Sequence, residues 1–297
     1  MSVISPNQVS LSHQHQASMI TSTQLEQLRS RIQSHPQSSK LLALLDDLTQ
    51  FELGRFLLQH RGLNAYWTSF LMRGYLQTHL RHPLEHWLVH EAPMVIATRE
   101  RYHIFGEQLQ QHVQSGMHIG SLPCGLFDEI HFLDPGRIST LALTGIDFDP
   151  VALSYAEAAL KDLPWSLRTE QLDAWALQAT DIFDVLICHG LNIYEANPKR
   201  LFDLYQRCFN ALQPEGWLLT SYISEPPTVT KNSRWQVHCP EHLPQQQSLF
   251  QDLIAARWQT YMSMDAMTQL LHQVGFRHIQ IIEDSQRIFP TVWAQKK

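Results

Sequence analysis

The chain has 297 residues but no long apolar run and no run of basic residues. Its apolar runs are shorter than the roughly 18 residues that a membrane-spanning helix needs. Its N-terminal segment lacks the basic start and apolar centre of a secretory signal. The formal net charge is −6, so charge does not favour binding to a phosphate backbone. We therefore expect a cytoplasmic protein with no membrane partner and no nucleic-acid partner.

Cysteine is also scarce, and the cysteines are far apart in the chain. They are Cys124, Cys188, Cys208 and Cys239. Because no C-x-x-C pair occurs, we expect neither a disulfide framework nor a cysteine zinc site. His82, His86 and His90 recur at a spacing that places three imidazoles on one helix face, where they could converge on a metal. However, Pro83 would begin that helix after His82, and no H-E-x-x-H pattern occurs, so we predict no metal site.

The first 115 residues are expected to be a polar tail followed by helices. Residues 1–22 are rich in Ser, Gln and His without periodicity, and we expect them to be disordered. Thr23 and Glu26 form the pattern of a capping box. The leucines of residues 41–48 recur at helical spacing. Residues 23–115 are therefore predicted to form an all-helical N-terminal cap.

After Gly116 the pattern changes to short apolar runs that alternate with helical stretches. This alternation is typical of βαβ units and a parallel sheet. The last two runs are too close together for a parallel crossover, so they should pair antiparallel. We predict an α/β fold with a doubly wound, seven-stranded sheet that ends in an antiparallel hairpin. The sheet would come from residues 116–223 and 275–297, with a helical insert at 224–274.

Several candidate site residues stand at the carboxyl ends of the predicted strands, where doubly wound sheets bind ligands. Gly125 follows the first strand and would open the next helix, where a ligand can approach the backbone. Asp147 ends the second strand 22 residues after Gly125, a spacing typical of a carboxylate that binds two ribose hydroxyls. Phe148 could lie against an adenine ring, and Asp173 could accept the adenine amino group. His189 follows the fourth strand at the same edge.

These residues also have purely structural interpretations. Asp147 could cap the helix that follows it, although Asp149 is better placed for that role. Asp173 could likewise cap a short helix that begins at Ala174. Cys124 lies in the first loop and is interpreted as a packed thiol rather than a nucleophile.

The order of five segments resembles that in the class I S-adenosylmethionine-dependent methyltransferases. The segments are G-S-L-P-C-G, G-I-D-F-D-P, Q-L-D-A, F-D-V-L-I-C-H-G-L and L-Q-P-E-G-W-L-L. The closing G-F…I-Q-I-I-E-D…F-P-T-V-W-A is similar to that family's final antiparallel hairpin. The resemblance covers residues 116–223 and 275–297. It implies a Rossmann-like core, S-adenosylmethionine as cofactor, and methyl transfer by in-line displacement to an oxygen or nitrogen atom of a small molecule.

The resemblance also implies a set of cofactor-binding residues at the carboxyl edge of the sheet. They are Ser121, Gly125, Asp147, Phe148, Asp173, Ala174, His189 and Arg99. The arginine would lie on the helix before the first strand and meet the carboxylate of the cofactor. Arg101 is the alternative for that role.

The first loop departs from the family pattern, acidic-x-Gly-x-Gly-x-Gly. Ser121 takes the acidic place, Pro123 and Phe127 take the first and third glycine places, and only Gly125 matches. A cofactor-binding or scaffold protein without turnover is therefore an alternative. A NAD-dependent oxidoreductase is a further alternative, because Asp147 is also the acid that a dinucleotide fold would use, but no G-x-G-x-x-G occurs.

His189 is the candidate catalytic residue, as a general base for the acceptor. A base is needed only if the acceptor keeps its proton at neutral pH, and a histidine at a strand end can equally be a structural hydrogen-bonding group. The acceptor would be held between the N-terminal helices and the 224–274 insert. The candidate acceptor-binding residues are Tyr66, Trp67, Asn192, Tyr194 and Arg257. The two N-terminal aromatic residues could equally be part of a helical core.

Overall fold

The computed structural model describes residues 20–73, 80–256 and 260–297. Nearly all of the predicted disordered tail, and the predicted acceptor residue Arg257, lie outside these residues. Within the described ranges, no helix combines the length and the apolar character that crossing a bilayer requires.

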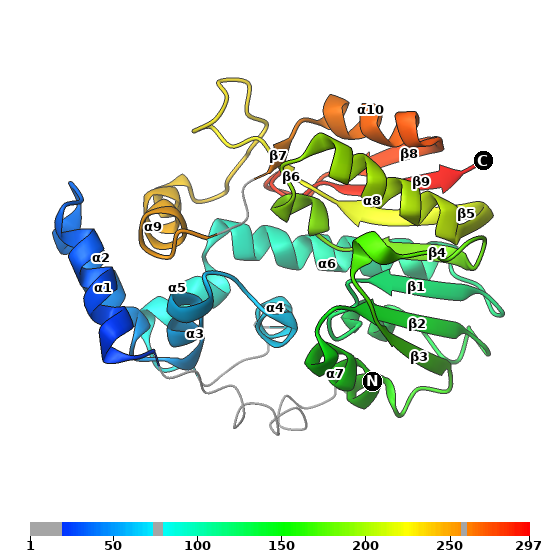
Figure 1. The fold of residues 1–297 in the computed structure, drawn as a ribbon, viewed down its shortest axis with the longest axis horizontal. Coiled ribbons are helices and arrows are strands. Elements are labelled where there is room, and N and C mark those ends of the chain that lie inside the picture. Colours follow the sequence, from blue (N-terminus) through cyan, green and yellow to red (C-terminus); the bar gives the residue numbers. More distant parts are fainter. Residues whose placement is uncertain (1–19, 74–79, 257–259) are drawn as a thin grey trace. The chain divides into compact units, whose positions relative to one another are not determined.

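Internal contacts divide the chain into two compact units (Figure 1). One contains residues up to 96 together with 238–257, and the other contains residues 97–237 and 258–297. Helix α6 (Pro93–His112) begins in the first unit and continues into the second. The segment predicted as one insert is shared between the two units.

The first unit is helical, and no strand occurs in the part of it that the structure describes. Its helices are α1 (Ser22–Gln33), α2 (Ser38–Leu48), α3 (Glu52–His60), α4 (Ala65–Met72), α5 (Pro83–His90) and α9 (Leu243–Gln247), with the 3-10 turn η6 (Pro240–His242) and the π-helical turn η7 (Ser248–Leu253). The leucines of α2 at positions 41, 44, 45 and 48 are buried. The predicted apolar face of this helix is therefore confirmed.

The first helix begins earlier than predicted. Thr21 is the N-cap of α1, and its Oγ1 accepts the backbone N–H of Gln24 at 3.2 Å. The Oε1 of Gln24 in turn accepts the backbone N–H of Thr21 at 2.9 Å. The capping box predicted at Thr23 and Glu26 is therefore wrong by two residues, because glutamine completes this motif as well as glutamate does.

The second unit is built on a seven-stranded sheet with the order β3-β2-β1-β4-β5-β9-β8. Its strands are β1 (His118–Leu122), β2 (Ala142–Asp147), β3 (Ser166–Gln171), β4 (Phe183–Cys188), β5 (Leu212–Ser221), β8 (Phe276–Ile282) and β9 (Thr291–Lys296). Strands β1 to β5 pair in parallel, and β9 pairs antiparallel with both β5 and β8. The predicted Rossmann-like α/β fold with an antiparallel terminal hairpin is confirmed. A short parallel pair, β6 (Ile223–Ser224) and β7 (Tyr261–Met262), was not predicted.

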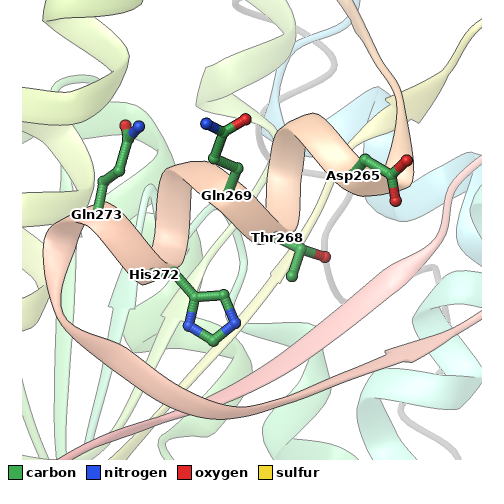
Figure 2. Close-up of a pocket in the computed structure, with 5 residues that line it drawn as sticks. All are labelled: Asp265, Thr268, Gln269, His272 and Gln273. Atoms are coloured by element: carbon green, nitrogen blue, oxygen red, sulfur yellow. The ribbon is translucent and has the colours of Figure 1, made fainter.

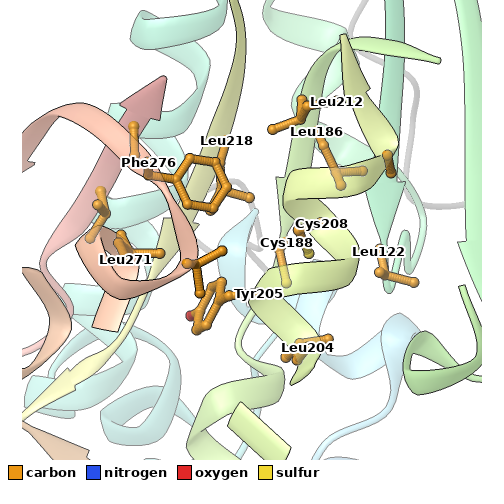
Figure 3. Close-up of a cluster of buried hydrophobic side chains, with 14 of the residues drawn as sticks. Leu122, Leu186, Cys188, Leu204, Tyr205, Cys208, Leu212, Leu218, Leu271 and Phe276 are labelled. Carbon is orange, nitrogen blue, oxygen red and sulfur yellow. The ribbon is translucent and has the colours of Figure 1, made fainter. Parts of the chain in front are cut away.

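Helices cover both faces of this sheet (Figure 1). Helices α8 (Pro198–Ala211) and α10 (Met264–Val274) pack on one face, where Tyr205, Leu218 and Leu271 belong to one buried cluster (Figure 3). Helices α6 and α7 (Pro150–Leu160) pack on the other face, where the cluster includes Phe105 and Leu153. Because both faces are buried, the central strand β4 is apolar at nearly every position.

The connection after β1 differs from the prediction that Gly125 opens a helix. The chain instead forms a short 3-10 turn, η3 (Asp128–Phe132), and no α-helix lies between β1 and β2. Phe127 precedes this turn in the left-handed region, with φ 55°. The D-P-G sequence at 134–136 follows it. A residue in the left-handed region and a proline-glycine turn both interrupt helical hydrogen bonding, so the segment cannot continue as an α-helix.

Candidate functional site

The first loop folds over the end of β2. The backbone N–H of Cys124 donates to the carbonyl of Ile146 at 2.8 Å. The backbone N–H of Gly125 donates to Oδ2 of Asp147 at 3.0 Å. Gly125 has a φ of 52°, in the region that glycine adopts without steric cost. The structure therefore brings together two of the predicted cofactor-binding residues, Gly125 and Asp147.

Asp147 is buried, with 8% of its surface exposed. Its second oxygen, Oδ1, accepts the backbone N–H of Asp149 at 3.0 Å. Burial raises the pKa of this carboxyl, and the hydrogen bonds from the amides of Asp149 and Gly125 oppose that shift. The cap of α7 is Asp149, which accepts the N–H of Val151. Asp147 is therefore not the helix cap, and its carboxylate supports the loop instead.

Phe148 and Asp173 are both exposed at the same edge of the sheet. Phe148 keeps 74% of its surface exposed. Asp173 is the N-cap of the 3-10 turn η4 (Ala174–Ala176), because its Oδ1 accepts the N–H of Trp175 at 3.0 Å. Ala174 is buried in the core. The structural interpretation of Asp173 as a cap is therefore confirmed, and its contact with an adenine stays a prediction.

Arg101 lies at the carboxyl end of the sheet. Its Nη1 donates to Oγ of Ser221 at 3.2 Å, and its guanidinium lies 5.0 Å from the ring centre of Phe289. Residues two apart on a helix do not face the same side, so Arg99 projects from a different side of α6. Of the two arginines suggested by the sequence, Arg101 is thus the one at the end of β5.

His189 is paired with a buried carboxylate that sequence reasoning missed. Its Nε2 lies 2.8 Å from Oε1 of Glu129, and its ring stacks on Phe105 with 5.2 Å between the ring centres. Its side chain is 21% exposed, whereas that of Glu129 is 4% exposed. Burial opposes the ionisation of Glu129, but the charges of His189 and Arg101 hold the pKa of this carboxyl below its usual value. The pair can therefore orient the imidazole and stabilise a proton on it.

Two further predicted residues are buried nearby with an unsatisfied oxygen. Ser121 is fully buried, and its Oγ has no hydrogen-bond partner among the described residues. Asn192 donates from Nδ2 to the carbonyl of Ser221 at 2.9 Å, while its Oδ1 has no partner in the same part of the chain. Tyr194, two residues later, is 56% exposed. Buried polar atoms without partners are rare in proteins and commonly mark a place for a ligand or water.

Other predicted residues lie in the first unit. Trp67 is 6% exposed and packs against Phe56 and Phe70, with 6.1 Å and 5.2 Å between the ring centres. Tyr66 meets the edge of Trp67 at 5.1 Å. Trp67 is therefore part of a helical core, and a role of either aromatic residue in acceptor binding stays a prediction.

The predicted packed thiol is consistent with the surroundings of Cys124. Cys124 is 3% exposed, and burial raises the pKa of its thiol, with a further contribution from the charges of Asp147 and Glu129. A Cβ at Gly145 would lie 3.0 Å from its sulfur. The thiol therefore fills the space beneath the loop.

Two of the three histidines at helical spacing have other partners. His82 is the N-cap of α5, and its Nδ1 accepts the N–H of Leu84 at 3.2 Å. His86 lies 3.3 Å from the carboxylate of Glu91. No group of three metal-ligating side chains is found among the residues that the structure describes.

One pocket lies on α10 (Figure 2). Five residues of that helix line it: Asp265, Thr268, Gln269, His272 and Gln273. Four of them are exposed and Thr268 is half-buried. The pocket contains none of the predicted site residues.

No family model and no curated protein matches the sequence. Among solved structures, a protein from Bordetella parapertussis described as a possible exported protein is 35% identical, with a TM-score of 0.87 and 99% of both chains covered. A putative S-adenosylmethionine-dependent methyltransferase from Listeria monocytogenes is 15% identical, with a TM-score of 0.47 over 67% of this chain and 98% of that one. The N-methyltransferase NodS from Bradyrhizobium japonicum is 13% identical, with a TM-score of 0.44 over 67% of this chain and 95% of that one.

The sequence identities and TM-scores to the two methyltransferases are too low to support a conclusion about function. The Bordetella protein, in contrast, matches along the whole chain at an identity that shows common descent. The chain described here belongs to the same family as that protein.

Proposed function

We propose that this chain is an S-adenosylmethionine-dependent methyltransferase that acts on an oxygen or nitrogen atom of a small molecule. One observation carries the proposal. The buried carboxylate of Asp147 ends β2 and is hydrogen-bonded to Gly125 of the first loop. It does so in a sheet whose order places β1 between β2 and β4. In such sheets the carboxyl edge beside the central strand binds nucleosides, and an acid at the end of the second strand binds the ribose.

The residues present fit this cofactor at its ribose end and its methionine end. Asp147 has the place and the acceptor oxygens for a sugar diol, and Phe148 offers an exposed ring beside it. Arg101 supplies a cation for a carboxylate. Ser121 and Asn192 each hold a buried oxygen that lacks a partner among the described residues. The fit is weaker in the loop, where Phe127 is fully buried in place of the family's third glycine.

The chain's own residues have modest chemical tasks. S-Adenosylmethionine, when bound, supplies a methyl group that the sulfonium already activates. The site must then align the acceptor and exclude water. His189 can accept a proton from an acceptor that is protonated at neutral pH, and Glu129 holds its imidazole at 2.8 Å and stabilises the imidazolium that forms. Asn192 and Tyr194 lie in the turn η5 (Leu191–Tyr194) after His189 and are proposed to contact the acceptor.

A cofactor-binding protein without turnover is the second candidate. It is favoured by the side chain of Phe127 in the first loop, and by the fact that both oxygens of Asp147 already accept backbone amides. Detection of S-adenosylhomocysteine after incubation with S-adenosylmethionine and a metabolite extract would exclude it. A nicotinamide-dependent reaction is disfavoured, because η3 is too short to offer a helix N-terminus to a pyrophosphate.

Isothermal titration calorimetry with S-adenosylmethionine tests the proposal. We expect saturable binding to the wild-type chain and binding roughly tenfold or more weaker in Asp147→Asn, because hydrogen bonds to a charged group contribute about 1.5–3 kcal/mol. Asp149→Asn is the matched control, since asparagine also caps helices well. Absence of saturable binding, or equal affinities in the two variants, would contradict the proposal.

A further inference from the structure

Five polar side chains lie on the side of the sheet that α6 covers. We call Arg101, Ser121, Glu129, His189 and Ser221 the α6 cluster. In β1, β4 and β5, the residues two positions before Ser121, His189 and Ser221 belong to the buried core that faces α6. Because side chains alternate along a strand, the three polar residues point toward the same face. Arg101 contacts Ser221, and Glu129 contacts His189.

Glu129 is the buried acid of the α6 cluster. It is 3% exposed, and its Oε2 has no hydrogen-bond partner among the described residues. Leaving a buried oxygen of a carboxylate unsatisfied is costly, so such an oxygen commonly has a ligand or water as its partner. The hydrogen bond with His189 and the charge of Arg101 favour the ionised form of this carboxylate. A donor that carries a positive charge would satisfy Oε2 best.

Arg101 is the half-buried cation of the α6 cluster. A guanidinium has five N–H donors. Among the described residues, one donor of Arg101 is hydrogen-bonded, to Oγ of Ser221. The charge of Arg101 interacts with that of Glu129. The remaining donors suit a carboxylate, which a guanidinium binds in a planar, bidentate manner.

We propose that Arg101 and Glu129 together bind the zwitterionic head of an α-amino acid, with its carboxylate on Arg101 and its ammonium on Oε2 of Glu129. This inference rests on the function proposed above, in which that head is the methionine end of the cofactor. A ligand with only negative charge, such as a phosphate, would be repelled by Glu129, and a simple amine would be repelled by Arg101. Glu129 thereby supplies, from η3, the acid that the first loop lacks at Ser121.

The test compares two nucleosides that differ in the amino acid head. Calorimetry on the full chain measures the affinity of S-adenosylhomocysteine, which has the head, and of 5′-methylthioadenosine, which lacks it. We expect Glu129→Gln and Arg101→Gln each to weaken S-adenosylhomocysteine at least tenfold and to change 5′-methylthioadenosine less than twofold. Unchanged affinity for 5′-methylthioadenosine also shows that the variant has kept its fold.

Glu107→Gln is the matched control, since Glu107 is an exposed acid on the same helix. It should change neither affinity. An analogue of S-adenosylhomocysteine without its amino group separates the two roles, because Arg101→Gln should weaken it and Glu129→Gln should not. Equal loss for both nucleosides, or no loss for S-adenosylhomocysteine, would overturn this inference alone. Failure of the wild-type chain to bind either nucleoside would overturn the proposed function and this inference with it.

Discussion

The carboxylate of Asp147 accepts the backbone N–H of Gly125 at 3.0 Å, across 22 residues of sequence. This bond joins the end of β2 to the loop that follows β1. A second bond, from the amide of Asp149, fixes the other oxygen of the same carboxylate. The acid is thus oriented by two fixed backbone donors, so a ligand that binds it meets a side chain with little freedom left to lose.

Gly106→Ala should destabilise the second unit, although alanine is the better helix former. A Cβ at position 106 would lie 2.3 Å from the ring of Phe132, so α6 and η3 would have to move apart. Overpacking of this kind costs about 1–3 kcal/mol, and the gain in helix propensity is about 1 kcal/mol. We expect a net loss of up to about 2 kcal/mol in the free energy of unfolding, measured with urea.

Gly62→Ala is the control for this substitution. A Cβ there would meet nothing within 4 Å, so the free energy of unfolding should change by less than about 0.5 kcal/mol. A Gly106→Ala variant that is more stable than the wild type would show that α6 does not pack tightly on Phe132.

The buried acid Glu129 should make stability depend on pH in the acid range. The pKa of its carboxyl is lower in the folded chain than its usual value, so the charged form favours folding. This contribution is complete above the unfolded pKa, about 4.3, and is lost as the pH falls through the folded pKa. The difference in free energy of unfolding between the wild type and Glu129→Gln should therefore shrink as the pH falls below about 4.3. The measurement is urea unfolding at a series of pH values. A difference that is constant, or grows as the pH falls, would contradict the ion pair with His189.

The four cysteines should differ sharply in reactivity. Cys239 is exposed, whereas the other three are buried, and burial raises the pKa of the Cys124 thiol. Because the thiolate is the reactive form, iodoacetamide should modify Cys239 in the native chain and reach Cys124 only after unfolding in urea. Peptide mass spectrometry measures both sites. Modification of Cys124 as fast as Cys239 would show that the first loop is open.

The strands of the sheet could be predicted because a strand that is buried on both faces appears in the sequence as a short run of apolar residues. Phe183–Cys188 is almost wholly apolar, and it forms the central strand β4. The two runs at the end of the chain are joined by too few residues for a crossover, and they form the antiparallel pair β8 and β9. Asp147 and Gly125 could be predicted from spacing alone, since their separation follows from the geometry of a strand-loop-strand unit.

The partner of His189 could not be predicted in the same way. Glu129 stands in a loop segment with no regular period, and its contact depends on the 3-10 turn that replaces the expected helix. The position of Phe127 at φ 55°, a conformation uncommon for a bulky residue, is set by tertiary packing rather than by local preference. The choice between Arg99 and Arg101 likewise depended on the rotation of α6 about its axis. Such details arise from tertiary contacts, for which a single sequence carries little signal.

The proposed ribose contact can be tested with a cofactor product that lacks the sugar diol. Calorimetry would compare S-adenosylhomocysteine with its 2′,3′-dideoxy analogue in the wild type and in Asp147→Asn. We predict that the wild type binds the analogue roughly tenfold or more weakly, as expected when hydrogen bonds to a charged group are lost, and that the variant shows little difference. Equal binding of both nucleosides by the wild type, or the same difference in the variant, would contradict the assignment of Asp147 to the ribose.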